Sequence, residues 1–308
     1  MLNWIVIGIG DIAIRRVIPA IQAEPRSRLY GLVTRDPAKA VSYGVRAWAT
    51  LDEALADEAV NAVYVGTPVF LHTPQTIQSL RAGKHVICEK PMALTVEDCG
   101  RMLEANNRSK GVLMVAHVLR FWPAYRVLHE AVVRGTYGAI RSARFRRRSG
   151  LPGWGPWLLR PEESGGAALD LLVHDYDQAL WLFGAPESAT ARTVGSPNVI
   201  ECTLRYAGGL EVGIAGGWYT GDVPFAMEFD LQASEGELRF AGGRLQLLRP
   251  SADPTEIALS QEDAYAAQLR YFIDCCREGH APLECPPETS AQAVELALSV
   301  SALAQKAV

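Results

Sequence analysis

The sequence predicts an α/β protein of two domains, the first with a doubly wound parallel sheet and the second an α+β domain with a large, mostly antiparallel open sheet. A glycine-rich turn follows the first apolar segment, and strand-like segments then alternate with helical ones up to residue 119. Short, turn-bounded strand-like segments dominate the remainder. Alternation is typical of parallel sheets, and runs of short strands are typical of antiparallel ones. We therefore predict domains 1–119 and 120–308.

The chain opens with a short apolar strand that leads into the glycine-rich turn. Residues 3–8 read Asn-Trp-Ile-Val-Ile-Gly, as in a buried parallel strand, and residues 8–13 read Gly-Ile-Gly-Asp-Ile-Ala before a helical pattern that ends near Ala23. This is the dinucleotide-binding fingerprint in its required context, where glycines permit the turn and the helix N-terminus receives a pyrophosphate. We predict a Rossmann domain. The expected cofactor contacts in the turn are Gly8, Ile9, Gly10, Asp11 and Ile12.

The second strand, residues 29–34, bears on the choice of cofactor. It ends in Thr34-Arg35-Asp36-Pro37. In NAD-preferring sites an acidic residue at this strand end binds the ribose hydroxyls. Thr34 stands at that position, and threonine with arginine can bind a 2′-phosphate, so we expect NADP and count Thr34 and Arg35 as contacts. The nearby Asp36 keeps NAD as the alternative, and Arg35 as an ordinary solvated loop residue is the other interpretation.

The alternation continues through the first domain, with strands followed by short polar turns. Thr67-Pro68 follows one strand and Glu89-Lys90-Pro91 follows the next. Because ligands bind at the carboxyl ends of parallel strands, Lys90 is well placed to face a nicotinamide, although an ordinary surface charge is the alternative. The predicted strands are residues 62–66, 85–88 and 112–116, and the predicted helices are 51–57, 74–82 and 96–106.

In the second domain, helices flank a series of strands. Gly208-Gly209 and Gly242-Gly243 are typical of hairpin turns. One sheet face would be uncovered and partly apolar, so we expect a homodimer or homotetramer through this sheet. The predicted strands are residues 139–149, 189–194, 199–206, 210–216, 226–233, 238–240 and 245–248, and the predicted helices are 125–134, 165–183, 265–277 and 290–307.

The predicted helix at residues 165–183 carries a carboxylate and an imidazole at helical spacing. Asp170 and His174 are four residues apart and would share a face, with Asp177 one turn further on. A carboxylate beside an imidazole can orient the ring and tune its proton affinity, as a general base near neutral pH requires. The alternative for this pair is a polar stripe on the helix surface.

Two other groups of residues have open interpretations. Arg144, Arg146 and Arg148 would share one face of a strand, as a solvated or intersubunit edge or as a contact to an acidic substrate. Trp154, Trp157 and Trp218 can form flat apolar walls against a sugar ring or belong to the core.

The motifs together resemble the glucose-fructose oxidoreductase/inositol dehydrogenase/MocA (Gfo/Idh/MocA) family over nearly the whole chain. The resemblance implies a metal-free oxidoreductase with His174 as proton acceptor, Asp170 as its orienting partner and Lys90 beside the cofactor. It adds Arg120 and Asp177 to a substrate site formed with Lys90, Asp170 and His174. Thr67, Pro68, His72, Glu89 and Lys90 would contact the cofactor, whereas Val69 stands where the family often has asparagine. The motifs that carry the resemblance are Gly8-x-Gly10-x-x-Ala13, Ala82-Gly83-Lys84-His85-Val86, Glu89-Lys90-Pro91, Arg120-Phe121-x-Pro123-x-Tyr125 and Gly165-Gly166-x3-Leu169-Asp170-x3-His174-x2-Asp177.

Composition excludes several other classes. The chain of 308 residues has a formal net charge of −4, which gives no general attraction to nucleic acid or anionic membranes. We see no signal peptide and no apolar run long enough to span a membrane. The six cysteines lack CxxC spacing, and the histidines offer no three-ligand metal pattern. We therefore expect a cytoplasmic, metal-free protein without a nucleic-acid or membrane partner.

The sequence thus predicts an NAD(P)-dependent dehydrogenase or reductase that acts on a secondary hydroxyl or ketone of a sugar, polyol or related small molecule. Two alternatives stay open. One is a nucleotide-binding regulator without catalysis, although such a protein would be expected to lose Lys90 or the Asp170/His174 pair. The other is an NAD-assisted glycoside hydrolase, in which the hydride returns to the sugar.

Overall fold

The computed structural model describes residues 1–153, 155–196 and 198–306, in two compact units. The first unit combines Met1–Phe121 with Glu262–Ala291, and the second combines residues 122–261 with the chain from Gln292 onward. The first boundary lies two residues beyond the predicted one. Residues 262–291, which the sequence analysis gave to the second domain, lie in the first unit. Trp154 and Ala307, the last residue of the final predicted helix, lie outside the described residues.

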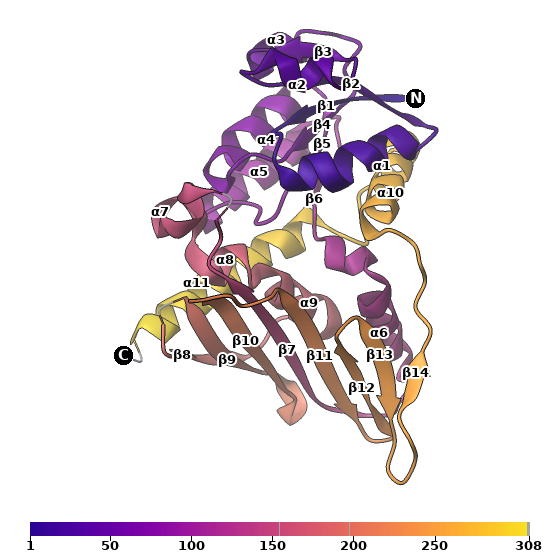
Figure 1. Ribbon diagram of the computed structural model, residues 1–308, viewed down its shortest axis with the longest axis vertical. Coiled ribbons are helices and arrows are strands. Elements are labelled where there is room, and N and C mark those ends of the chain that lie inside the picture. Colours follow the sequence, from indigo (N-terminus) through magenta and orange to yellow (C-terminus); the bar gives the residue numbers. More distant parts are fainter. Residues whose placement is uncertain (154, 197, 307–308) are drawn as a thin grey trace. The chain divides into compact units, whose positions relative to one another are not determined.

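The first unit contains a six-stranded parallel sheet, which confirms the doubly wound α/β prediction (Figure 1). Strand order reverses between β1 and β4, because β2 leads away on one side of β1 and β4 starts on the other. That reversal is the position at which such folds bind nucleotides, beyond the carboxyl ends of the strands. From edge to edge the strands are β3 (Arg46–Trp48), β2 (Ser27–Val33), β1 (Leu2–Ile7), β4 (Ala62–Val65), β5 (His85–Cys88) and β6 (Leu113–Val115).

Helices lie on both faces of this sheet, α4 and α5 on one side and α1 and α10 on the other (Figure 1). The helix α10 (Ala264–Glu278) comes from the C-terminal segment of the first unit. It joins this unit because its buried Phe272 packs against Trp4 of β1, with ring centroids 5.7 Å apart, and because Arg26 forms an ion pair with Asp274. The other helices are η1 (Ala13–Val17, a π-helical segment), α1 (Ile18–Ala23), α2 (Pro37–Val41), α3 (Leu51–Leu55), η2 (Val69–Leu71), α4 (His72–Arg81), α5 (Val96–Arg108) and η3 (Val118–Phe121).

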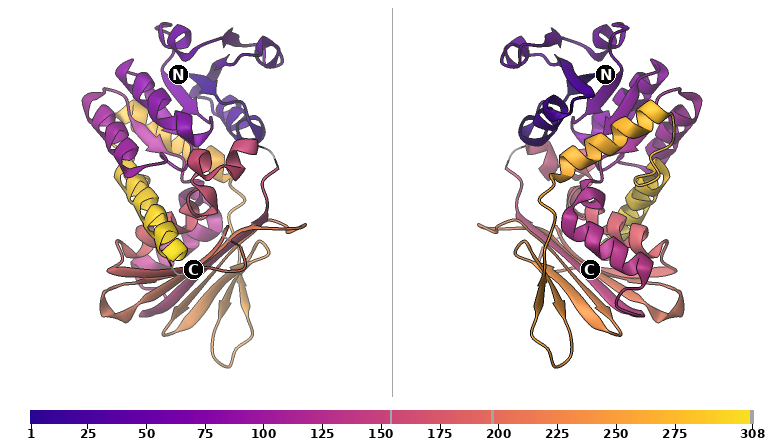
Figure 2. Two further views of the ribbon diagram at one scale, coloured as in Figure 1. Left: turned by 90° about the vertical axis from the view of Figure 1, so that its left-hand side faces the viewer. Right: turned by 90° about the vertical axis from the view of Figure 1, so that its right-hand side faces the viewer.

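The second unit contains an eight-stranded sheet with helices over one face (Figure 2). Among the described residues, β7 and β10 pair in parallel and the other neighbours pair antiparallel, as predicted. Both predicted glycine turns connect antiparallel neighbours, β9 to β10 and β12 to β13. In spatial order the strands are β14 (Thr255–Ile257), β13 (Arg244–Leu248), β12 (Gly236–Ala241), β11 (Ala226–Ala233), β7 (Ile140–Gly150), β10 (Glu211–Tyr219), β9 (Val199–Arg205) and β8 (Ser188–Thr193).

An aromatic cluster forms much of the core between this sheet and its helices. Phe229 of β11 lies 5.2 Å from Tyr125 of α6 and 5.5 Å from Phe240 of β12, measured between ring centroids. All three side chains are nearly inaccessible to solvent, which anchors α6 on the sheet. The helices of this unit are α6 (Pro123–Arg134), η4 (Pro156–Leu159), α7 (Pro161–Ser164), α8 (Gly166–Asp170), α9 (Val173–Phe183), η5 (Ala207–Gly209) and α11 (Pro287–Lys306), of which α11 begins in the segment of the first unit.

The predicted single helix over residues 165–183 is wrong in one respect, because it is divided into α8 and α9. The N–H of Leu172 bonds to the carbonyl of Ala167, five residues back, and the N–H of Leu171 uses the same carbonyl. The turn at Leu172 is therefore wider than an α-helical one, and it separates the helix that carries Asp170 from the helix that carries His174. Asp170 ends α8, and His174 is the second residue of α9.

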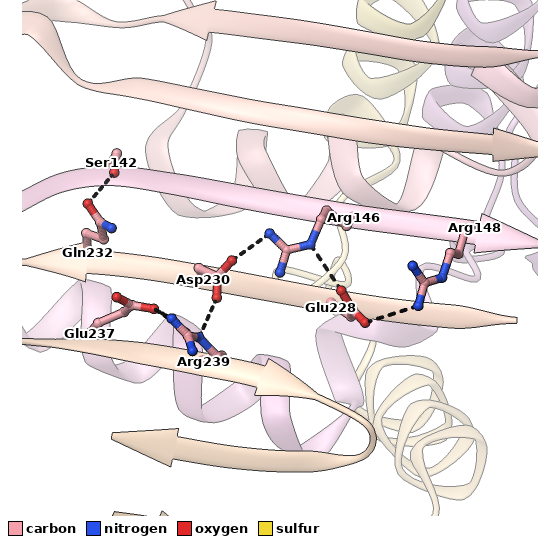
Figure 3. A network of polar contacts seen from close by, with 8 residues as sticks. All are labelled: Ser142, Arg146, Arg148, Glu228, Asp230, Gln232, Glu237 and Arg239. Carbon is pink, nitrogen blue, oxygen red and sulfur yellow. Dashed lines mark hydrogen bonds and ion pairs between the residues drawn. The ribbon is translucent and has the colours of Figure 1, made fainter. Parts of the chain in front are cut away.

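The sheet face opposite these helices carries charged side chains joined across strands (Figure 3). Arg146 lies 3.0 Å from Glu228 and 2.7 Å from Asp230, and Asp230 in turn lies 3.1 Å from Arg239. Arg144, Arg146 and Arg148 alternate with the buried Phe145 and Arg147, as expected for a strand. This part of the face is polar rather than apolar, and assembly through the sheet stays a prediction.

Candidate active site

The glycine-rich turn brings the carboxyl ends of β1 and β4 into contact. Gly8 has a φ of +87°, and a Cβ built on it would lie 2.2 Å from the carbonyl carbon of Gly66. Only glycine fits there. A Cβ on Gly10, in contrast, would meet nothing within 4 Å, so the backbone at Gly10 borders open space. The turn therefore has the close strand contact and the open approach that a dinucleotide pyrophosphate requires, and these residues fit NAD(P).

Of the three polar residues that follow β2, Thr34 and Asp36 form local hydrogen bonds and Arg35 is exposed. The carboxylate of Asp36 accepts a hydrogen bond from the N–H of Ala38 at 3.1 Å and so caps α2. The hydroxyl of Thr34 accepts from the N–H of Asp36, also at 3.1 Å. The side chain of Arg35 is exposed beside them. Asp36 is thus partly engaged in a local cap, whereas the exposed cation lies next to the expected position of the 2′-substituent.

The Thr67 turn after β4 is held by His72. The imidazole is 1% exposed, with Nε2 2.8 Å from the carbonyl oxygen of Thr67 and Nδ1 2.9 Å from that of Pro91. The hydroxyl of Thr67 donates to Oε1 of Gln75 at 2.7 Å. His72, predicted to contact the cofactor, thus lies between the backbones of two loops that were both predicted to contact it.

The loop after β5 is braced from inside by its own glutamate. The hydroxyl of Tyr64 donates to one carboxylate oxygen of Glu89, and the N–H of Lys90 donates to the other at 3.2 Å. Burial, and then the charge of Glu89, raise the pKa of Tyr64 well above its usual value, so the phenol stays a donor. Lys90 is half-buried, and its peptide bond to Pro91 is cis. The lysine therefore lies between Glu89, which is bound by Tyr64, and Pro91, whose carbonyl is bound by His72.

Arg120, predicted to bind substrate, is 1% exposed. Its guanidinium donates to the carbonyl of Glu284 at 3.1 Å and to the hydroxyl of Thr289 at 2.9 Å. Both acceptors belong to the C-terminal segment of the first unit. These contacts give Arg120 a part in attaching that segment, which the sequence analysis did not foresee.

The remaining predicted residues lie in the second unit, close together along the α8–α9 segment. Asp170 and His174 are half-buried, and Asp177 is 1% exposed. Between them, Asp175 forms a bidentate pair with Arg147 of β7, at 2.8 Å to Nε and 3.0 Å to Nη2. Burial raises the pKa of the Asp175 carboxyl, and the charge of Arg147 opposes that rise.

The sequence analysis missed this pair, although one signal was present. Arg147 occupies an inward position of β7, in phase with the buried Ala143 and Phe145, where an apolar residue is the rule. Because a buried charge is costly unless it is paired, an inward arginine indicates a buried carboxylate nearby. The alternation of residues in β7 does not identify that carboxylate.

Two further predictions concern ligands and aromatic walls. Within residues 1–153, 155–196 and 198–306, no group of three or more His, Cys, Asp or Glu side chains is arranged to hold a metal ion. Trp218 is buried with Leu158 and Ala167, and Trp157 packs against that cluster, which favours the core role for both tryptophans.

None of the described helices is long and apolar enough to cross a membrane.

Comparison with known proteins identifies similar chains. The model of an oxidoreductase family with an NAD-binding Rossmann fold (GFO_IDH_MocA) matches residues 2–117, and the model of the GFO/IDH/MocA C-terminal domain matches residues 125–239. The chain is 40% identical over 185 residues to 1,5-anhydro-D-fructose reductase from Ensifer adhaerens, covering 58% of this chain and 55% of that protein's length.

Solved structures resemble the whole chain. Aldose-aldose oxidoreductase from Caulobacter crescentus, complexed with glycerol, has a TM-score of 0.90 at 22% identity and covers 100% of this chain and 98% of its own. A 3-ketoreductase from Actinomadura kijaniata, in complex with NADP and TDP-benzene, has a TM-score of 0.86 at 24% identity, with 98% and 97% covered. At these identities the likeness establishes the fold.

Proposed function

The chain belongs to the Gfo/Idh/MocA family of oxidoreductases, and on this premise we propose that it is an NAD(P)-dependent dehydrogenase or reductase of a sugar or polyol. The reaction transfers a hydride between the nicotinamide and a carbon that bears a secondary hydroxyl or a ketone. The names of the relatives support this class, since one acts on 1,5-anhydro-D-fructose and another is a 3-ketoreductase.

One observation carries the proposal. Lys90 follows β5 at the same sheet edge as the Gly8–Gly10 turn, with Thr67 between them at the end of β4. A cation at the carboxyl ends of these strands can serve a reaction that develops negative charge on a substrate oxygen. The chain also retains Asp170 and His174, which such a reaction needs for its proton.

The residues divide the chemistry between them. When bound, the nicotinamide supplies the hydride acceptor or donor. In the oxidative direction His174 takes the hydroxyl proton, and Asp170 orients the imidazole or binds a neighbouring hydroxyl. Lys90 stabilises negative charge that develops on the substrate oxygen, and Asp177 completes the substrate site. Arg120 acts mainly through the segment that it attaches, since two of its donors are already used there.

The function is tested with a panel of sugars and polyols, measured by the absorbance of NADPH and NADH. We expect net reduction of the cofactor with at least one free sugar or polyol, and oxidation of NADPH with the matching ketone. Cofactor binding without turnover on the whole panel would favour the regulator. Glycoside cleavage without net change in NADH would favour the hydrolase.

We propose NADP as the preferred cofactor, with Thr34 and Arg35 binding its 2′-phosphate. The Arg35→Ala variant is expected to raise KM for NADPH by about tenfold or more, since a charged hydrogen bond is lost, and to change KM for NADH little. Arg28→Ala is the matched control, because Arg28 is exposed near the opposite end of the same strand. Equal changes for both cofactors would contradict the assignment.

Two further proposals concern the location of the protein and its assembly. We propose a cytoplasmic protein, consistent with free thiols at the described cysteines, which lie mostly in the interior. We also propose a homodimer or homotetramer through the second sheet. An interface over β7, β11 and β12 would cover the ion-paired side chains of Figure 3 and would therefore be polar in part.

A further inference from the structure

We propose that His72 carries a proton on both ring nitrogens and that this imidazolium clamps together the two loops beside the nicotinamide site. The consequence for catalysis rests on the proposed function, whereas the protonation state rests on geometry alone. His72 is thereby a positioning residue for Lys90, rather than a direct contact of the cofactor.

The protonation state follows from the two acceptors. A neutral imidazole has one N–H donor and one nitrogen lone pair. Both partners of His72 are carbonyl oxygens, at 2.8 and 2.9 Å, and a carbonyl oxygen can only accept. In either neutral tautomer, one ring nitrogen would therefore direct its lone pair at an oxygen lone pair within hydrogen-bonding distance. With 1% exposure there is little room for the ring to turn away from that contact.

Burial works against this charge, so the acceptors must compensate for it. Removing an imidazolium from water favours the neutral form. Hydrogen bonds from a charged donor are about twice as strong as neutral ones, and both nitrogens of His72 have such a bond available. Neither neutral tautomer avoids the repulsion. With the proton on Nδ1 the repulsive contact is to Thr67, and with the proton on Nε2 it is to Pro91.

Two other histidines of the first unit provide internal references. Nδ1 of His85 accepts a hydrogen bond from the N–H of Val112 at 3.1 Å, which requires an unprotonated nitrogen, and burial lowers the pKa of this histidine. His280 is exposed beside Glu278, and a hydrogen bond to the carbonyl of Ala281, then the glutamate, raise its pKa. The first unit thus contains one histidine whose pKa is lowered by burial and one, at the surface, whose pKa is raised by its acceptors.

The position of the clamp gives it a role at the site. Thr67 lies just beyond β4, and Pro91 directly follows Lys90 beyond β5, and these strands are neighbours in the sheet. One rigid ring therefore fixes the spacing of the two loops. Because Lys90 precedes the clamped carbonyl by one residue, the ring limits where the lysine backbone can move. A displacement of about 1 Å at a reacting group can cost about a hundredfold in rate.

The protonation state is tested by nitrogen NMR of the full chain labelled at histidine. Near neutral pH we expect one buried histidine with both ring nitrogens protonated, assigned to His72 because its signals vanish in His72→Gln. His85 should show one protonated nitrogen, Nε2. A His72 spectrum with a single protonated nitrogen would overturn the inference, and this experiment needs neither a substrate nor a variant that is active.

The positioning role is tested by kinetics and cofactor binding. A glutamine at residue 72 can donate to one carbonyl but must turn its oxygen or leave a gap at the other. We expect His72→Gln to lower kcat about 10- to 100-fold and to weaken NADPH binding, whereas His85→Gln, at the opposite end of β5, retains both. An unchanged kcat and an unchanged Kd for NADPH in His72→Gln would refute the role. If no substrate is found, the NADPH affinity and the NMR spectrum still decide the inference.

Discussion

Replacing His174 with alanine is expected to lower kcat by about 10²- to 10⁴-fold while NADPH still binds, because the hydroxyl proton loses its acceptor. Lys90→Ala should lower kcat by a comparable factor, since charge that develops on oxygen loses its stabilising cation. Both changes leave the Gly8–Gly10 turn intact, so the Kd for NADPH should change much less than kcat. Stopped-flow turnover and fluorescence titration with NADPH measure the two quantities.

Surface residues of the same types serve as controls for these variants. His280→Ala and Lys110→Ala remove an exposed imidazole and an exposed ammonium group. They should retain kcat and the affinity for NADPH. If His174→Ala and Lys90→Ala turned over as fast as these controls, the roles assigned to both residues would be wrong.

The second large effect concerns the stability of the second unit. Asp175→Ala is expected to lower the free energy of unfolding by about 3–5 kcal/mol, because it leaves the guanidinium of Arg147 buried without a counter-ion. Both side chains of the pair are almost completely buried, at 2% and 0% exposure. Urea unfolding followed by circular dichroism measures the change.

Two further variants separate the cost of an uncompensated charge from the loss of a contact. Arg192→Ala breaks an exposed ion pair with Glu201 and should change stability by about 1 kcal/mol or less. Arg147→Met combined with Asp175→Leu removes both buried charges and should recover much of the stability lost in Asp175→Ala. A loss below about 1 kcal/mol in Asp175→Ala would contradict the account.

The pair also bears on the site, because Asp175 directly follows His174. Its bidentate contact attaches the first turn of α9 to β7. We therefore expect Asp175→Ala to lower kcat as well as stability. The recovery of kcat in the double variant would then show whether packing alone can hold the turn.

Much of the fold was predictable because local pattern and local structure agree. The apolar runs before Gly8 and Gly66 became β1 and β4, and the spacing around Gly208 and Gly242 marked real turns. Several short elements, such as β3 and β14, were not predicted. In β3 (Arg46–Trp48) only three residues pair with β2, too few for a pattern, and Trp48 finds its place against Gly31, where a Cβ would lie 2.1 Å from the indole.

The candidate site was likewise predictable only in part. Its residue types could be listed from motifs, since Gly8, Lys90 and His174 stand in recognisable local contexts. The contacts from His72 to Pro91 and from Arg120 to Glu284 could not, because these partners are 19 and 164 residues away and no local spacing encodes them. The division of the predicted helix into α8 and α9 was also not predicted, since the apolar periodicity continues through it, whereas the N–H of Leu172 bonds to a carbonyl five residues back.

Local order along the chain was therefore sufficient for the fold class, the nucleotide-binding turn and the list of candidate residues. Tertiary structure decided which of these side chains are held in the interior and by what. Residues 262–291 belong to the first unit because Phe272 buries its ring against Trp4, and Arg147 faces inward because Asp175 meets it there. In both cases two segments that are distant in the sequence bury side chains against each other. The free energy of that burial depends on both segments together, so neither segment predicts it alone.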